Sequence, residues 1–562
     1  MTGLACVGLG ALAAAAQPQV LRRTVDDLYH GVTAGRLGRY ALVYLAIALV
    51  AGAFRFFARW LVNGAAREIE YELRNTLFAH LQTMPAQYFQ RERAGDLMSR
   101  LTNDLAAVRT MLGVAVMQGG NTLTVALLAL GFMVAISPRL TLLSLLPLPL
   151  VSFVVWFAGE RIQRRFEALQ AQFAALVARV QESLAGVREV RAAARERHEL
   201  AELEALNEAY RDRHLALTRA SAAFDPALAL LSGIATVLAL WLGGGEVVAG
   251  RITLGQFVAF TVYLGMLNWP MVALGQVVSQ LQRGTASWAR LLDVLERAPA
   301  IANAHDARPL PFPRGEIEVR DLTFAYPGAP APALRGVSFR VRAGEFVGIV
   351  GETGAGKSTL LSLLPRAYDP PAGAVFLDGM DVRELDLGDL RGALGWVMQE
   401  PFLFSGTLAD NIAFGGWRPE AEAIVRAARR ASLAEDVRAF PDGLATAVGE
   451  RGVALSGGQR QRVAIARTLL GRGRVLLLDD CLSSVDAATE RAVLDGLMAE
   501  RGRRTLLLVS HRVRAVQDAD TILVLERGRI VERGTHAALL ARAGRYAALV
   551  RRQQLEEELA AS

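Results

Sequence analysis

The residues best suited to chemistry lie in one glycine-rich loop, which contains the only lysine of the chain. Among the 62 lysine and arginine residues, the single lysine is Lys357. A compact ammonium fits among backbone N–H groups wrapped round a polyphosphate, whereas a planar guanidinium is too large for such a loop. The loop fits the pattern G-x-x-x-x-G-K-[ST]. Its residues are Gly351, Glu352, Thr353, Gly354, Ala355, Gly356, Lys357, Ser358 and Thr359.

A buried strand and a helix are expected on either side of this loop. Residues 346–350 form a short apolar run of the buried-strand type, and Ser358 opens a helical segment. This order offers phosphates the N–H groups of the loop and the positive end of a helix dipole. We expect Lys357 to reach the β- and γ-phosphates of ATP and Ser358 to bind Mg²⁺.

A second apolar run ends in two acidic residues, Asp479 and Asp480, after residues 474–478. A buried strand would deliver a carboxylate to its carboxyl-terminal edge, where Asp479 can hold the water shell of the metal. The alternative is a strand end with two solvated acids. Together with the glycine loop, this run predicts a P-loop nucleotide hydrolase.

The run 455–462, Leu-Ser-Gly-Gly-Gln-Arg-Gln-Arg, resembles the signature motif of ATP-binding cassette (ABC) ATPases. Ser456, Gly457, Gly458 and Gln459 would begin a helix whose N–H groups and dipole point outward as a second anion site. Because the chain already has its own glycine loop, the second site suits phosphates held by a facing subunit. The motif therefore implies a pair of cassettes.

The same resemblance implies roles for other residues of the nucleotide-binding half. Tyr326 resembles the aromatic residue that stacks on adenine, and Gln399 resembles the glutamine that contacts Mg²⁺ and the attacking water. His511 matches the switch histidine that contacts the γ-phosphate. Residues 483–486 resemble the loop that crosses between cassettes, and residues 446–452 resemble an exporter-specific stretch. Taken alone, such an aromatic or histidine is more often structural.

Asp480 departs from the family pattern, in which a glutamate follows the metal-binding aspartate and polarises the attacking water. Aspartate is one methylene shorter, and a displacement of about 1 Å can cost roughly 10²-fold in rate. We therefore expect this chain's own site to bind ATP and hydrolyse it slowly, as in one subunit of heterodimeric exporters. The alternative is a homodimer in which Asp480 is an adequate catalytic residue.

Hydrophobic residues make up 52% of the chain, which is too many for an ordinary soluble enzyme. They concentrate before about residue 285, in six stretches that are mostly long enough to cross about 30 Å of hydrocarbon. The first stretch could instead be a signal peptide, but it has no basic leading segment. The six stretches lie near residues 2–22, 38–62, 111–136, 140–158, 225–248 and 255–282.

The placement of arginine predicts the orientation of these spans. Residues 64–110 and 160–223 are rich in arginine, whereas the loops near 25–37, 137–139 and 243–254 carry little charge. The positive-inside rule predicts that the two long segments and both chain ends are cytoplasmic. We expect the protein to lie in the cytoplasmic membrane of a bacterium. The net charge of +7 then reflects topology and attraction to membrane lipid, and no nucleic-acid partner is expected.

The predicted architecture is an all-α transmembrane domain of six spans with long cytoplasmic extensions, followed by an α/β P-loop ABC ATPase domain. The two cysteines, one in each half, are too few for a disulfide framework or a metal site. We expect a transmembrane domain at 1–297, a proline-rich linker at 298–315, a nucleotide-binding domain at 316–553 and a tail at 554–562.

The resemblance covers nearly the whole chain, since residues 95–104 and 182–188 are similar to the cytoplasmic loops of six-span ABC exporters. It implies one half of a dimeric exporter, which moves a hydrophobic or amphipathic drug, lipid or peptide when ATP closes the two cassettes. The spans exclude a soluble ABC ATPase of repair or translation, and an importer is disfavoured because its permease and ATPase are usually separate chains. A channel or regulator on the same scaffold is a further alternative.

Substrate contacts are much less visible in the sequence. Arg55 and Arg59 could face the cavity as anion contacts, or extend to the membrane interface. Other polar and aromatic residues could line a path or pack between spans. They are Gln118, Asn121, Tyr263, Asn268, Trp269, Gln276 and Gln280.

Overall fold

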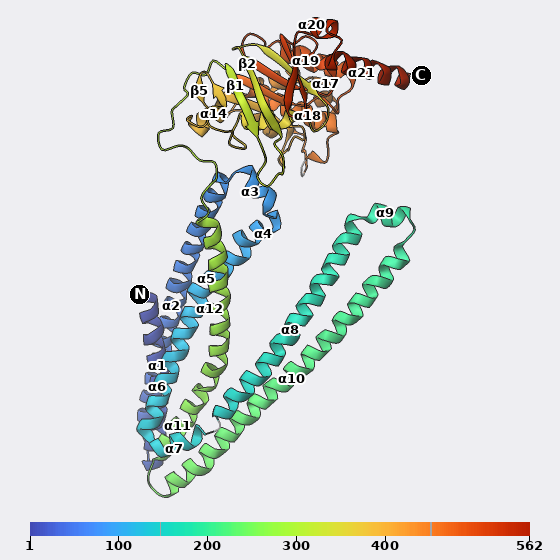
Figure 1. The fold of residues 1–562 in the computed structure, drawn as a ribbon. Helices are drawn as coiled ribbons and strands as arrows, with labels where there is room; N and C mark the ends of the chain where they lie inside the picture. Colours follow the sequence, from blue (N-terminus) through green and yellow to red (C-terminus); the bar gives the residue numbers. More distant parts are fainter. Residues whose placement is uncertain (147, 450–451, 562) are drawn as a thin grey trace. The chain divides into compact units, whose positions relative to one another are not determined.

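The structure is a computed structural model that describes residues 1–146, 148–449 and 452–561. These residues divide into a helical unit and an α/β unit, and each is compact by itself (Figure 1). The helical unit holds Met1–Leu81 and Ala94–Arg297, and the α/β unit holds Gln82–Arg93 and Ala298–Ser562.

The helical unit follows the apolar stretches of the sequence. Two of its helices begin at residues that cap them: Ser137 Oγ accepts a hydrogen bond from Leu140 N, and Thr253 forms a capping box with Gln256. The helices are α1 (Thr2–His30), α2 (Ala34–Thr83), α4 (Ala94–Ser99), η1 (Arg100–Asp104), α5 (Leu105–Thr110), η2 (Met111–Ala115), α6 (Val116–Ile136), α7 (Pro138–Ser144), α8 (Leu148–Ala185), α9 (Val187–Ala192), α10 (Glu196–Val248), α11 (Leu254–Met266) and α12 (Asn268–Leu295).

Four of the described helices are long and apolar enough to cross a membrane, namely Thr2–His30, Ala34–Thr83, Ala94–Ile136 and Ala229–Val248. They coincide with the first, second, third and fifth predicted spans. The fourth predicted span, near 140–158, contains residue 147, which lies outside the described residues. The sixth, predicted near 255–282, is not one continuous helix, because the chain turns at Leu267 between α11 and α12.

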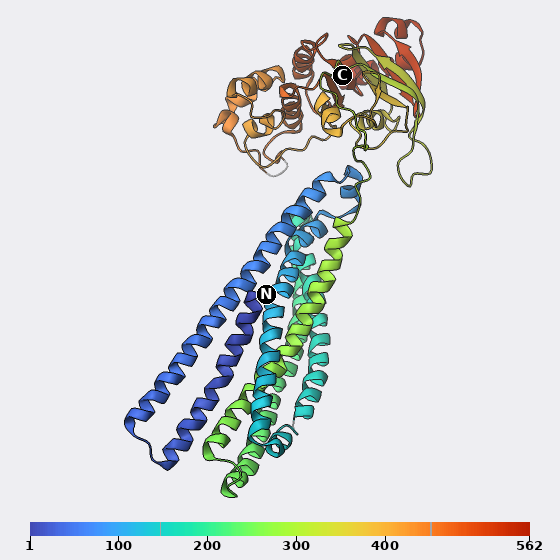
Figure 2. The same cartoon turned by 90° about the vertical axis from the view of Figure 1, so that its left-hand side faces the viewer.

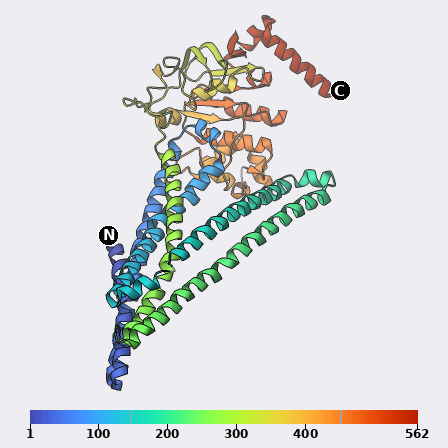
Figure 3. The same cartoon turned by 60° about the horizontal axis from the view of Figure 1, so that its bottom comes forward.

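Helices α8 and α10 form a long hairpin that diverges from the other helices of this unit towards α9 (Figures 1 and 3). Hydrogen bonds cross between the two helices along their length. Gln172 Nε2 donates to Leu206 O at 3.0 Å, and Arg179 donates to the Glu199 carboxylate at 2.9 Å. The hairpin contacts the remaining helices at α7 and α11.

The remaining helices pack closely, and one predicted path residue lies inside that packing. Helix α1 contacts α6 and α11. Tyr263 on α11 is fully buried; its hydroxyl donates to Ala15 O at 2.7 Å and accepts from Gln19 Nε2 at 3.0 Å. Tyr263 therefore packs between helices, whereas Trp269 is exposed. The side chain of Asn268 lies outside the described part of the structure.

The α/β unit is built around a six-stranded sheet in the order β10-β9-β3-β8-β7-β6. All neighbours in this sheet are parallel except β10, which is antiparallel to β9. A second sheet has the order β2-β1-β4-β5. The strands are β1 (Ile317–Phe324), β2 (Leu334–Val341), β3 (Phe346–Gly351), β4 (Val375–Leu377), β5 (Met380–Asp381), β6 (Leu394–Val397), β7 (Val475–Asp479), β8 (Thr505–Val509), β9 (Thr521–Glu526) and β10 (Arg529–Gly534).

Strands β3, β7 and β8 of the larger sheet are buried along their whole length, which explains their continuous apolar runs. In β3, Phe346 and Val350 face one hydrophobic core, while Val347 and Ile349 face another. Several helices, coloured orange, gather to one side of the strands (Figure 2). The helices are α3 (Ala86–Arg91), α13 (Lys357–Leu363), α14 (Leu387–Ala393), α15 (Leu408–Ala413), α16 (Ala421–Arg430), α17 (Ala434–Ala439), η3 (Gly443–Ala445), α18 (Gly457–Leu470), α19 (Ala487–Met498), η5 (Val513–Val516), α20 (His536–Ala541) and α21 (Arg545–Ala561).

Two segments from outside the sheets are bonded to the α/β unit. In the proline-rich segment 298–315, Asn303 Nδ2 donates to the Asp386 carboxylate at 2.6 Å and Leu310 N donates to Asp389 Oδ2 at 2.8 Å. Helix α3 also belongs to this unit, because the Tyr368 hydroxyl donates to Gln90 Oε1 at 3.1 Å. Helix α3 is followed by residues 95–104, which were predicted to be a cytoplasmic loop. These residues form the first part of the long helix Ala94–Ile136.

Candidate nucleotide-binding site

Four neighbouring parallel strands deliver the predicted site residues to one edge of the larger sheet. β3 ends in Gly351 at the glycine loop, and β7 ends at Asp479. His511 lies two residues beyond the end of β8, and Gln399 lies two residues beyond the end of β6. The register pairs Asp479 with Val509, so the ends of these strands are level. The strand order β3-β8-β7-β6 therefore brings together residues that are far apart in the sequence.

The glycine loop encloses the ammonium group of Lys357. Nζ donates to the carbonyl oxygens of Gly351 and Glu352, each at 2.9 Å, and the residue is only 5% exposed. Burial lowers the pKa of Lys357 below its ordinary value, although the nearby carboxylates of Asp480 and Asp479 act in the opposite direction. The loop thus holds a desolvated cation, which is suited to binding an anion.

Glycine is required where this loop turns into α13. Gly354 and Gly356 have φ angles of +80° and +98°, a region that favours glycine. A Cβ on Gly356 would lie 2.8 Å from Ala333 O. The intervening residue, Ala355, is buried and packs in a hydrophobic core. The backbone therefore takes the folded-back shape that a nest of N–H groups needs.

Ser358 and Asp479 place two oxygen atoms beside the glycine loop, where they could bind a metal ion. Ser358 Oγ donates to Asp479 Oδ1 at 3.0 Å. Burial raises the pKa of Asp479, and the charge of Asp480 raises it further, whereas the Ser358 hydrogen bond and Lys357 lower it. No described group of three or more His, Cys, Asp or Glu side chains could hold a metal. The chemistry fits Mg²⁺, which is usually bound by one or two carboxylates, water and phosphate oxygens.

Asp480 is held tightly by the ends of β7 and β8. Its φ angle is +45°, which aspartate adopts more readily than most residues. Asp480 N donates to Val509 O at 2.9 Å, and Oδ1 accepts a long hydrogen bond of 3.4 Å from His511 N. The residue is 7% exposed. The Asp480 carboxylate therefore lies against the backbone of the loop that follows β8, residues 510–513, which is called the histidine loop below.

Tyr326 lies beside the start of α13. Its hydroxyl shares a hydrogen bond of 2.9 Å with Thr359 Oγ1. Its ring meets Phe324 and Tyr368 edge to face, with centroids 5.3 and 5.0 Å away. Gln399, the last predicted residue of this edge, is exposed. The aromatic neighbours fix the tyrosine ring, and Tyr368 was not singled out from the sequence.

The signature run forms an exposed, capped helix start. Ser456 precedes α18, and its Oγ accepts from Gln459 N at 3.2 Å, while Gln459 Oε1 accepts from Ser456 N at 2.9 Å. Gln459 Nε2 also donates to Asp436 Oδ1 at 2.8 Å. This reciprocal capping box leaves the first turn rigid and its helix dipole directed outward.

The signature helix packs on the loop formed by residues 483–486. Gly458 is buried there, and a Cβ on it would lie 2.7 Å from Ser484 O. Gln461 Nε2 donates to Ser483 Oγ, and Gln461 Oε1 accepts from Ser484 N, both at 3.1 Å. Gln461 belongs to the signature run, but no role was assigned to it from the sequence. Residues 450 and 451 of the exporter-specific stretch lie outside the described residues.

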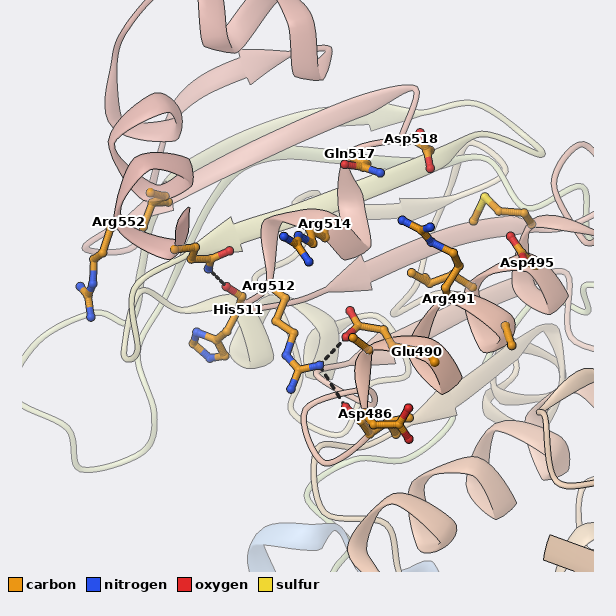
Figure 4. Close-up of a pocket in the computed structure, with 18 of the residues that line it drawn as sticks. Asp486, Glu490, Arg491, Asp495, His511, Arg512, Arg514, Gln517, Asp518 and Arg552 are labelled. Carbon is orange, nitrogen blue, oxygen red and sulfur yellow. Dashed lines mark hydrogen bonds and ion pairs between the residues drawn. The ribbon is translucent and has the colours of Figure 1, made fainter. Parts of the chain in front are cut away.

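A cleft of about 1650 Å³ opens beside the glycine loop (Figure 4). Its walls come from the glycine loop, the loop 483–486, α19, the histidine loop and α21; they include Gly351, Glu352, Thr353, Asp486, His511 and Gln553. The described residues that line it include neither the signature turn, Ser456–Gln459, nor Lys357, Ser358, Asp479 and Asp480 deeper at the sheet edge. Within one chain, the signature turn and the glycine loop therefore do not share this cleft.

Comparison with known proteins decides the family. The ABC transporter transmembrane region matches residues 1–271, and the ABC transporter ATPase family matches residues 334–483. The multidrug resistance-like ATP-binding protein MdlA of Escherichia coli (strain K12) is 37% identical over 544 residues, which cover 96% of this chain and 92% of that protein. The chain belongs to the ABC exporters. As such, this half-transporter joins a membrane domain to an ATPase domain.

Other ABC exporters resemble the chain along its whole length. An ATP-dependent lipid A-core flippase of Thiobacillus denitrificans is 34% identical, and the match covers 98% of this chain and 95% of the flippase. The solved structure of a bacterial Atm1-family ABC exporter with ATP bound has 29% identity and a TM-score of 0.80, with 98% and 97% of the two chains covered. The predicted order of a helical membrane domain and an α/β ATPase domain is confirmed, as is the prediction of an ATP hydrolase.

Proposed function

We propose that this chain exports a hydrophobic or amphipathic molecule across the bacterial cytoplasmic membrane, as one half of a dimer with a second ABC half-transporter. The single observation that carries the proposal is the separation of the two phosphate-facing motifs. Ser456, at the start of the signature turn, is exposed, and Ser456–Gln459 are not among the described residues that line the cleft beside residues 351–353. Each ATP would therefore lie between the loop of one chain and the signature turn of its partner.

The residues at the sheet edge divide the work of binding ATP. The backbone of residues 351–359 and the ammonium group of Lys357 bind the phosphates, and Tyr326 stacks on adenine. Ser358, Gln399 and Asp479 would hold Mg²⁺, which neutralises charge on the phosphate oxygens when bound.

The residues that act on the γ-phosphate come from both subunits. Asp480 orients the attacking water, and His511 contacts the γ-phosphate. Ser456, Gly457, Gly458 and Gln459 complete the site of the facing subunit with the positive end of α18. Both contributions are needed at once, so hydrolysis requires that the two cassettes close on each other.

The site on this chain's own loop is proposed to turn over slowly, with a different chain as partner. Asp480 carries one methylene fewer than the usual glutamate, and its carboxylate accepts a long hydrogen bond of 3.4 Å from His511 N. Water positioned about 1 Å too far away reacts more slowly. The signature turn is intact, so the partner's site can be fully active.

A homodimer is the second candidate. Asp480 and His511 lie next to each other at the same sheet edge, where Asp480 could still orient the attacking water beside His511. In that case the two sites would be identical and Asp480 would support all of the ATP turnover.

The relatives' names support an amphipathic cargo. They include a multidrug resistance-like protein and an ATP-dependent lipid A-core flippase. Arg55 and Arg59 are exposed on α2, where either could meet an anionic headgroup.

Photolabelling of the purified complex tests the dimeric site. An ATP analogue with a photoreactive group on its γ-phosphate should label two polypeptides, one near Lys357 and the other near Ser456. Purification from the native host shows in addition whether a second cassette chain accompanies this one. Labelling confined to one polypeptide would overturn the proposed arrangement.

A further inference from the structure

The carboxyl-terminal helix α21 is anchored to the α/β unit and reaches the histidine loop. Tyr546 and Ala547, in its first turn, are buried, and the Tyr546 hydroxyl is hydrogen-bonded to His536 Nδ1 at 2.6 Å. Leu549 and Val550 pack against the hydrophobic core one turn later. The next turn carries Gln553, which lines the cleft beside the glycine loop.

Gln553 binds the backbone on both sides of one residue of the histidine loop. Its Oε1 accepts a hydrogen bond from Val513 N at 2.9 Å, and its Nε2 donates to His511 O. The amide side chain supplies the acceptor and the donor of these two bonds on separate atoms. A glutamate would keep the acceptor and lose the donor, and a leucine would lose both.

The residue between these two contacts, Arg512, is bound to the loop that is proposed to cross between cassettes. Its guanidinium donates to Val485 O at 3.0 Å and to Ser483 O at 3.3 Å. It also forms an ion pair with Glu490 on α19 (Figure 4). Glu490 is buried, so this ion pair is shielded from solvent on one side. Helix α21, the histidine loop and the loop 483–486 are thus one connected network.

We propose that Gln553 is a positioning residue for ATP hydrolysis: it fixes the backbone of His511 at the γ-phosphate side of the site. The proposal rests on the proposed function, which assigns the γ-phosphate contact to His511. Loss of either hydrogen bond would free the carbonyl or the N–H group that flanks Arg512. The imidazole would then be held less accurately, while the glycine loop and its phosphate contacts would be unchanged.

The effect should appear in kcat and not in KM. In the full-length complex, the slow phase of single-turnover ATP hydrolysis reports this chain's own site. Its rate constant, called kcat below, should fall by about 5- to 10-fold in Gln553→Leu, because misplacement of a γ-phosphate contact slows the reaction. The KM for ATP should change by less than about twofold. The neighbouring Gln554 is exposed, so Gln554→Leu is the matched control and should leave both constants unchanged.

Hydrogen exchange reports the same contact without relying on activity. The Val513 amide should exchange about tenfold faster in Gln553→Leu than in Gln554→Leu. Gln553→Glu should retain the protection of Val513, because its carboxylate still accepts that bond, but should still lower kcat. The glutamate variant carries the test if the leucine variant fails to fold. Unchanged exchange in Gln553→Leu, or an unchanged kcat in both Gln553 variants, would overturn the inference.

One further variant separates failure of this inference from failure of the proposed function. Lys357→Ala should lose ATP binding at this chain's loop whatever the role of Gln553. Retained binding in Lys357→Ala would refute the assignment of the ATP site itself. Lost binding in Lys357→Ala together with wild-type kcat in Gln553→Leu would refute the positioning role alone.

Discussion

The glycine loop and the signature turn are both suited to phosphate, but the chain builds them differently. The loop is enclosed: Lys357 is 5% exposed and its ammonium is surrounded by carbonyl oxygens and nearby carboxylates. The signature turn is open at its start, because Ser456 is exposed and its side chain and N–H group are bonded to Gln459, the third residue of the same helix. The first encloses its cation with groups from one chain, and the second is a surface that is proposed to act on the ATP of a partner.

The largest expected effect is on the enclosed side of this comparison. Lys357→Ala removes the cation of the loop and should weaken ATP binding at this chain's site by about 100-fold or more, because charge-assisted hydrogen bonds to phosphate are lost. Equilibrium binding of a fluorescent ATP analogue measures this change. Ser456→Ala in the same chain is the control and should bind ATP normally. Equal losses in both variants would contradict the separation of the two motifs.

On the open side, Ser456→Ala should impair the partner's catalysis while leaving this chain's loop intact. The variant loses the hydroxyl that caps α18, and a roughly 10-fold fall in turnover of the complex is expected from the displaced helix start. The measurement is ATP hydrolysis by the complex at saturating ATP. Gln554→Ala, on the exposed part of α21, serves as the neutral control. Wild-type turnover in Ser456→Ala would argue against a shared site.

Asp480 sharpens the comparison, because it belongs to the enclosed side and is proposed to be slow. Asp480→Asn should change turnover of the complex by less than about twofold if the partner's site does the work. Asp480→Glu restores the missing methylene and should raise turnover, against a backbone cost of about 1 kcal/mol at the positive φ angle. A large loss in Asp480→Asn would instead favour the homodimer.

A small loss of ATP affinity is expected at the adenine end of the enclosed side. Tyr326→Phe removes the hydroxyl that bonds Thr359 but keeps the ring, so ATP affinity should fall by about threefold or less, or under 1 kcal/mol. Tyr326→Ala removes the ring as well and should cost more. Binding titrations on both variants separate the two contributions, and equal affinities would show that the ring does not stack on adenine.

Site residues that belong to one short motif could be predicted from the sequence. Contacts between residues that are far apart in the sequence could not. The glycine loop and the acids after β7 were visible because strand, turn and helix signals are local. The contacts of Tyr326 with Tyr368, of Gln461 with Ser483 and of Gln553 with His511 depend on tertiary packing. No pattern in a single sequence pairs such residues.

The sixth predicted span shows a different limit. Hydropathy reports how much apolar chain is present, but the backbone direction depends on local geometry. The turn at Leu267 comes just before Pro270, which lacks an N–H group and suits the first turn of a helix. The proline-rich segment 298–315 was expected to be a linker, and its bonds to Asp386 and Asp389 required the folded α/β unit.

Because the chain has only one lysine, that residue can be labelled selectively without mutation. Apart from the amino terminus, Lys357 is the only primary amine, so an amine-reactive reagent has one side chain to modify. Bound ATP should shield that amine, and the extent of acylation would then report nucleotide occupancy without any engineered label. A lysine-specific protease would cut the unfolded chain at one peptide bond, within the glycine loop itself.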